Sequence, residues 1–184
     1  MSESRMMTFN ERINAIPVIL EGFERFWGFT SSLYKLTTVS LRPNEHKTCV
    51  GVLFPVNEEQ LNLLDERERG YNRISILPNQ LHAFYSNGNL PQNQITYTYV
   101  STIHNQPSQK YPVVQSDIDA ILTGCLEDFN ESFARAVVRT TSDWNSPYLN
   151  DRKHPRYPYS HHRAELLPMI NTILEEEGPA GAFE

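Results

Sequence analysis

One carboxylate occupies an unusual position in the predicted secondary structure. Asn57 begins a helical segment as an N-cap residue, acidic residues follow in the first turn, and Gln60 completes a capping box. At about 100° per residue, Leu61 and Leu64 form the inward stripe of this helix, and Glu68 falls on the same stripe. Burial favours the neutral form of a carboxyl group and raises its pKa. Glu68 is therefore a candidate general acid or base near neutral pH.

A structural role for Glu68 fits the same pattern. The residue lies in the last predicted turn of the helix, where side chains often reach water. Arg67, Arg69 or Arg73 could pair with it as a simple surface cation. The pattern alone does not name a reaction, so both interpretations stay open at this point.

Alternating and helical hydrophobic patterns predict the elements that must position Glu68. Five segments favour strands, four favour helices, and Gly70 is a natural stop for the helix that carries Glu68. Several strands with helices between and after them indicate an α+β fold. The predicted strands are residues 17–30, 34–41, 48–56, 71–77 and 94–103; the predicted helices are 3–16, 57–69, 116–137 and 162–176; a turn is predicted at 42–45, and loops at 78–93, 106–112 and 146–159.

Composition excludes several classes of protein. The 184 residues fit one compact domain, and a net charge of −6 argues against binding nucleic acid or an anionic membrane surface. No apolar run approaches the roughly 20 residues that span a bilayer. The first ten residues lack the layout of a signal peptide. Cys49 and Cys125 are interpreted as reduced, buried thiols, so we predict a cytoplasmic protein.

Other reactive side chains point to no second chemistry. His161 and His162 are adjacent and face different directions, so we expect no metal site. Cys125 lies on the apolar stripe of the predicted helix 116–137 and is expected in the core rather than as a nucleophile. Tyr97 and Tyr99 share one face of a strand. That face either belongs to the core or lines an interior where a ligand sits.

A family resemblance rests on the residues around Glu68. Residues 51–56 (Gly-Val-Leu-Phe-Pro-Val) and 64–73 (Leu-Asp-Glu-Arg-Glu-Arg-Gly-Tyr-Asn-Arg) resemble the signature of the γ-glutamylcyclotransferase superfamily. That signature is a Gly-led strand, a short helix that ends Leu-Asp-x-x-Glu, and a strand that begins Gly-Tyr-x-Arg. Further colinear similarities are found at residues 17–27, 108–112 and 118–127, and at Trp144 and residues 150–152, which resemble a C-terminal extension of one branch.

The resemblance implies a fold and a reaction. The expected fold is a small closed or nearly closed β-barrel with flanking helices over residues 1–140, and residues 141–184 form an extension packed on the same domain. The implied substrate is a small γ-glutamyl compound, which cyclises to 5-oxoproline and releases an amine, amino acid or dipeptide, with no metal or organic cofactor. Glu68 would move the proton from the substrate amine to the leaving nitrogen. Tyr71, Tyr99 and Tyr111 would contact the substrate.

One part of the family pattern is missing from this sequence. Family members begin with a strand and a Tyr-Gly-Ser turn, whose backbone N–H groups bind the substrate. No Tyr-Gly-Ser occurs in this sequence, and residues 4–8 resemble the segment after that turn, so the chain is expected to start downstream of it. We therefore expect an opened barrel and weak or absent cyclotransferase activity in the chain as written. The alternative function is a non-catalytic binding or interaction module on the same fold.

Overall fold

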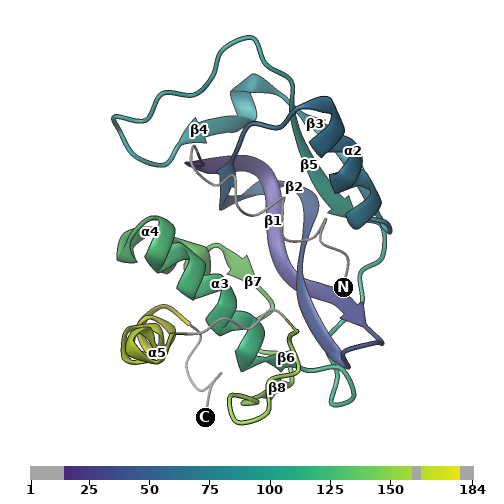
Figure 1. Ribbon diagram of the computed structural model, residues 1–184, viewed down its shortest axis with the longest axis vertical. Helices are drawn as coiled ribbons and strands as arrows, with labels where there is room; N and C mark the ends of the chain where they lie inside the picture. Colours follow the sequence, from purple (N-terminus) through teal and green to yellow (C-terminus); the bar gives the residue numbers. More distant parts are fainter. Residues whose placement is uncertain (1–14, 159–162, 179–184) are drawn as a thin grey trace.

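The computed structural model describes residues 15–158 and 163–178, and it has the predicted α+β class (Figure 1). Most of the predicted helix at 3–16 lies outside the described residues, and Ile16 instead begins the first strand. Two short 3₁₀ turns, Pro78–Gln80 and Ala164–Leu166, precede β4 and α5. The strands are β1 (Ile16–Ser31), β2 (Leu36–Leu53), β3 (Tyr71–Ile76), β4 (Leu81–Ala83), β5 (Thr96–Ser101), β6 (Val113–Val114), β7 (Thr141–Ser142) and β8 (Tyr148–Leu149); the helices are α2 (Glu58–Arg67), α3 (Gln115–Asp128), α4 (Glu131–Arg139) and α5 (Leu167–Glu177).

The strands form an open sheet and a separate hairpin. Five strands follow the order β4-β1-β2-β6-β8, and β7 pairs with β1 off this path. The β1–β2 and β1–β4 pairs are antiparallel, whereas β7, β6 and β8 join their neighbours in parallel. In the described part of the chain β3 and β5 pair only with each other. The sheet is therefore not closed, and the expected barrel is not confirmed.

The β1–β2 hairpin corrects the predicted turn at residues 42–45. These residues lie inside one continuous strand, in which Arg42 pairs with Glu24 across the ladder. The Arg42 Nε donates to Glu24 Oε2 at 2.8 Å, and this cross-strand pair holds the segment extended. A register shift between Glu21 and Phe23, where Gly22 has a φ of +80°, accommodates Pro43 opposite Phe23.

The predicted helix over residues 116–137 is two helices. Phe129 ends α3 with a non-helical backbone, and Asn130 begins α4 as an N-cap whose side chain accepts from the Phe133 N–H at 3.0 Å. Both helices keep the same apolar stripe toward the core, which is why the periodicity suggests a single element. The sequence patterns predict none of the short strands β4, β6, β7 and β8, and β4 and β8 lie within the loops predicted at 78–93 and 146–159. Each of these strands obtains its partner from a distant part of the chain.

Two hydrophobic clusters lie on the two sides of the β1–β2 hairpin. In Figure 1, α3, α4 and α5 gather on one side of β1 and β2, and α2 lies with β3 and β5 on the other. The larger cluster includes Trp27 of β1, Cys125 of α3 and Ile170 of α5, so the described part of residues 141–178 shares this core. The smaller cluster joins Leu20, Phe23, Cys49, Ile76 and Val100 under the β3–β5 hairpin.

The described residues also bear on the two cysteines and on membrane-spanning helices. Both cysteines are buried and no disulfide joins them, and Cys125 belongs to the core as predicted. None of the described helices is long and apolar enough to cross a membrane.

Candidate active site

The short helix α2 delivers Glu68 to the start of β3. The predicted capping box is confirmed: Asn57 Oδ1 accepts from the Gln60 N–H at 2.9 Å, and Gln60 Oε1 accepts from the Asn57 N–H at 2.8 Å. The helix ends at Arg67, so Glu68 is its C-cap residue rather than part of its last turn. The Glu68 N–H still donates to Leu64 O at 2.8 Å. The chain then reverses into β3.

Gly70 makes this reversal possible. Its φ of +102° lies in the region that favours glycine, as the sequence predicted for the residue after the helix. The Tyr71 N–H donates to Glu68 O at 2.9 Å and closes the turn. Glu68 and Tyr71 are thus fixed next to each other by backbone geometry, before any side-chain contact is considered.

Glu68 is partly buried and also paired. Its side chain is 27% exposed, and burial raises the pKa of the carboxyl above its ordinary value although the Arg67 charge lowers it. The Arg67 Nε lies 3.3 Å from Glu68 Oε1. Arg73 takes a different partner, because its Nη1 donates to Asp65 Oδ2 at 2.6 Å. Both interpretations of the sequence therefore describe part of this environment: burial raises the pKa of the Glu68 carboxyl, and Arg67 pairs with it.

Tyr71 connects Glu68 to the interior. Its ring stacks on Phe29 of β1 with centroids 4.9 Å apart. Burial raises the pKa of the Tyr71 hydroxyl far above its usual range, and the negative charges of Glu68 and Asp117 add to the rise, while the Ser40 hydroxyl opposes it. Tyr71 therefore lies within electrostatic reach of two carboxyl groups from different elements.

Asp117 is the second of these carboxyl groups, and it was not predicted from the sequence. The residue lies in the first turn of α3 and is 1% exposed. Burial raises the pKa of Asp117 to about 7, a hydrogen bond from Thr38 lowers it, and the charge of Asp151 raises it. Its Oδ2 atom has no hydrogen-bond partner among the described residues.

A sequence signal for Asp117 does exist. Asp117 lies four residues before Ile121 and eight before Cys125, at the edge of the apolar stripe of α3. An acid in a first helical turn is ordinarily explained by the helix dipole, which hides this signal. Ser40 gives no such signal, because a serine in an alternating strand pattern fits either face.

The two other predicted substrate contacts lie in different surroundings. The Tyr99 hydroxyl donates to Asp65 Oδ1 at 2.7 Å, and burial with this bond raises the pKa of Tyr99 to about 12. Tyr99 thus braces β5 against α2. Tyr111 lies in the turn before β6, where its carbonyl accepts from Thr37 Oγ1 at 2.7 Å and its N–H donates to Ser108 O at 2.9 Å. None of these three hydrogen bonds involves Glu68.

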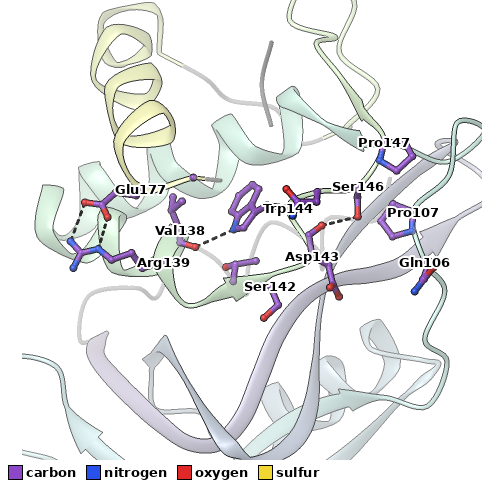
Figure 2. A pocket seen from close by; sticks show the side chains of 13 residues that line it. Gln106, Pro107, Val138, Arg139, Ser142, Asp143, Trp144, Ser146, Pro147 and Glu177 are labelled. Carbon is purple, nitrogen blue, oxygen red and sulfur yellow. Dashed lines mark hydrogen bonds and ion pairs between the residues drawn. The ribbon is translucent and has the colours of Figure 1, made fainter. Parts of the chain in front are cut away.

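A cavity of about 650 Å³ lies elsewhere, between α4, β7 and the end of α5 (Figure 2). In its wall Trp144 Nε1 donates to Val138 O at 3.1 Å, and Arg139 pairs with Glu177 at 2.6 Å. Trp144 also meets Trp27 edge to face, with ring centroids 5.3 Å apart. Glu68 does not line this cavity.

The described part of the chain has no cluster of side chains that could bind a metal ion. Within residues 15–158 and 163–178, no three or more His, Cys, Asp or Glu side chains gather so that they could hold an ion. The adjacent His161 and His162 lie outside these residues.

Comparisons with known proteins support the fold. No protein-family model matches the chain, and no curated protein matches it significantly. Among solved structures, one described as a γ-glutamyl cyclotransferase matches with a TM-score of 0.56 and 16% identity, over 91% of each chain. An uncharacterized protein from Homo sapiens, loc79017, matches with a TM-score of 0.52 and 16% identity, over 91% of this chain and 90% of that chain. The resemblance predicted from the sequence is therefore confirmed at the level of the fold: the chain has the mixed α+β fold of γ-glutamyl cyclotransferase.

Proposed function

We propose that the chain acts on a small γ-glutamyl amide and cyclises it to 5-oxoproline, with Glu68 as the acid–base residue and no cofactor. The observation that carries the proposal is the position of Glu68. A partly buried carboxyl with a raised pKa follows a capped helix and immediately precedes the Gly-Tyr turn, on a fold shared with a γ-glutamyl cyclotransferase.

The reaction needs one proton acceptor that becomes a proton donor. Glu68 takes a proton from the substrate α-ammonium, and the freed amine attacks the γ-carbonyl carbon to form the five-membered ring. The C–N bond to the leaving group then breaks, Glu68 returns the proton to the departing nitrogen, and the ring nitrogen gives up its second proton to the released amine or to solvent. No water is consumed, and the products are 5-oxoproline and an amine, amino acid or dipeptide. Because ring closure is intramolecular, the protein mainly selects a folded substrate conformer and manages protons.

The surroundings of Glu68 suit this role. A carboxyl whose pKa is raised by burial is a better base toward an ammonium group than a fully solvated one. Its 27% exposed side chain leaves a route for a small substrate from solvent. Tyr71 is the neighbouring hydroxyl that can orient either Glu68 or the substrate, whereas Tyr111 remains a proposed contact from the family resemblance. Because the Tyr99 hydroxyl already donates to Asp65, Tyr99 would contribute ring surface rather than a hydrogen bond.

A second candidate, a binding module without turnover, is favoured by two observations. The Arg67 guanidinium lies 3.3 Å from Glu68 and would have to yield before the carboxylate accepts a proton. In the described residues the sheet is open rather than closed into a barrel. Both functions predict affinity for γ-glutamyl compounds, and only the first predicts product.

The reducing compartment predicted from the cysteines suits both functions. Cys49 and Cys125 are buried with no disulfide between them. We propose a cytoplasmic location on this ground, because disulfides are rare where thiols are kept reduced.

The deciding experiment measures 5-oxoproline release from a panel of γ-glutamyl amines, amino acids and dipeptides by mass spectrometry. The 184-residue chain is assayed beside a version that restores any coding sequence in frame upstream of Met1. We expect Glu68→Gln to lower kcat about 10²–10⁴-fold, the usual contribution of a positioned acid–base group. Glu66→Gln is the matched control, because Glu66 lies on the same helix with an exposed side chain.

The two functions separate cleanly in this assay. Equal turnover by Glu68→Gln and the native chain removes Glu68 from the mechanism. Micromolar binding of γ-glutamyl compounds by calorimetry, with no 5-oxoproline from either chain length, supports the binding module instead.

A further inference from the structure

Two buried polar atoms near Tyr71 have no hydrogen-bond partner among the described residues. They are Asp117 Oδ2 and Ser40 Oγ, in side chains that are 1% and 5% exposed. A buried polar atom without a partner is costly, and an ionised carboxylate in that state is costlier still. Such atoms are uncommon in folded proteins and call for a physical reason.

Strand β2 joins these two atoms to the candidate site. Thr38 and Ser40 are two residues apart on β2, so their side chains lie on the same face of the strand. The Thr38 hydroxyl donates to the Asp117 carboxyl, and the Ser40 hydroxyl faces Tyr71 without completing a hydrogen bond of its own. A row of hydroxyl groups therefore leads from the first turn of α3 to the first residue of β3.

Tyr71 lies at the end of this row, and its pKa responds to carboxyl groups on two different elements. The charge of Glu68 and the charge of Asp117 both raise the pKa of Tyr71, so its hydroxyl lies within the electrostatic influence of both carboxyl groups. A phenol hydroxyl has a single proton, which rotates to suit its best acceptor. Tyr71 can therefore donate toward Glu68 or toward the interior, but not toward both at once.

We propose that Asp117 is a positioning residue of the candidate site: while it is protonated, Tyr71 directs its hydroxyl toward Glu68, and when it ionises, Tyr71 turns its hydroxyl toward the interior. This role rests on the proposed function of Glu68. It makes Asp117 a switch for the alkaline limit of the reaction, although Asp117 itself touches no substrate.

The groups around each titrating side chain define the direction of the effect. Asp117 is acted on by Thr38 of β2, by Tyr71 of β3 and by Asp151, whose charge raises its pKa. The Asp151 carboxylate accepts bonds from the Ser116 N–H, the Ser116 hydroxyl and the Arg156 N–H at 2.7–2.8 Å. Asp151 is thus well solvated by protein donors, whereas Asp117 is not. Glu68 has Arg67 beside it, which favours its ionised form.

The first test needs no substrate. Tyrosine labelled with ¹³C at the ζ carbon is incorporated, the Tyr71 signal is assigned by its loss in Tyr71→Phe, and its shift is followed against pH. We expect a step with a midpoint near pH 7, because burial raises the pKa of Asp117 to about that value. The step should vanish in Asp117→Asn and persist in Glu68→Gln and in Asp119→Asn. Absence of the step in the native protein, or its survival in Asp117→Asn, overturns the proposal.

Asp119→Asn is the matched control for structural damage. Asp119 lies on the same helix, is fully buried, and pairs with Arg152 at 2.7 Å rather than with Tyr71. Its substitution removes a buried carboxylate and perturbs α3 without changing the charge that acts on Tyr71. A step that disappears equally in both variants would mean that α3 has merely shifted, and that result also overturns the proposal.

The second test is the pH dependence of kcat/KM for the best γ-glutamyl substrate. In the native protein we expect an alkaline fall above about pH 7, close to tenfold for each pH unit. In Asp117→Asn the fall should begin at least about one pH unit higher, whereas Asp119→Asn should keep the native limb. An unmoved limb in Asp117→Asn overturns the proposal. If no chain converts any γ-glutamyl amide, the proposed function fails, and the Tyr71 titration still decides whether Asp117 controls Tyr71.

Discussion

Asp117→Asn should change how the stability of the fold depends on pH. Burial raises the pKa of Asp117 from its ordinary 3.8 to about 7, and the side chain is almost completely enclosed. The folded protein therefore holds a proton that the unfolded chain releases. A group of this kind contributes its full stability below the unfolded pKa and loses it as the pH rises through the folded pKa.

The magnitude is set by the two pKa values. At about 1.36 kcal/mol for each pH unit, the rise from 3.8 to about 7 corresponds to about 4 kcal/mol of unfolding free energy. The native protein should lose this amount between about pH 4 and pH 7, and then no more on account of Asp117. Asparagine cannot ionise, so the variant lacks this loss. It should gain stability relative to the native chain as the pH rises through this window.

Urea unfolding at closely spaced pH values measures the effect. The difference in unfolding free energy between the native chain and Asp117→Asn should fall steadily across the window and become flat above it. A reductant keeps Cys49 and Cys125 as thiols, and Glu66→Gln serves as a control for an acid-to-amide substitution at an exposed position. A difference for Asp117→Asn that is flat from about pH 4 to pH 8 would show that this carboxyl stays ionised in the fold and would refute the reasoning.

Two further predictions concern stability. Burial alone would raise the pKa of Glu24, but hydrogen bonds led by that of Arg42 lower it to about 2, so its stabilising effect is present above pH 4.5 and disappears as the pH falls toward 2. The difference in unfolding free energy between the native chain and Glu24→Gln should therefore change with pH only below about pH 4.5. A difference that stays constant from about pH 2 to pH 6 would contradict this. Arg25 donates to Val50 O and Val137 O at 2.7 Å, so Arg25→Met should lower the unfolding free energy by about 2 kcal/mol or more, because each of these two carbonyls loses one donor. A urea midpoint within error of the native value would show that water replaces the guanidinium.

Local interactions made much of the fold predictable. The capping box at Asn57 and Gln60, the stop at Gly70 and the strand that begins at Tyr71 each depend on residues a few positions apart. The sequence therefore predicts that Glu68 and Tyr71 lie next to each other at this turn. The partial burial of Glu68 was also expected from its place on the stripe with Leu61 and Leu64, although all three side chains remain only half-buried.

Contacts between distant parts of the chain decided several features of the fold that the sequence patterns did not predict. Residues 42–45 have the composition of a turn, but Glu24 on the neighbouring strand holds Arg42 in an extended ladder. The single periodic stripe over residues 116–137 did not reveal the break at Asn130, because both helices bury the same face. The barrel did not close, because β3 and β5 form their own hairpin in the described chain.

The sequence by itself determined one carboxylate, Glu68, and the turn that carries it, because helix caps and a glycine with positive φ act over a few residues. Only the tertiary structure brought Ser40 and Asp117 to Tyr71, since these residues come from three elements separated by dozens of positions. The energy of a buried carboxyl depends on which atoms surround it in space. Those surroundings exist only after β2, β3 and α3 have packed together.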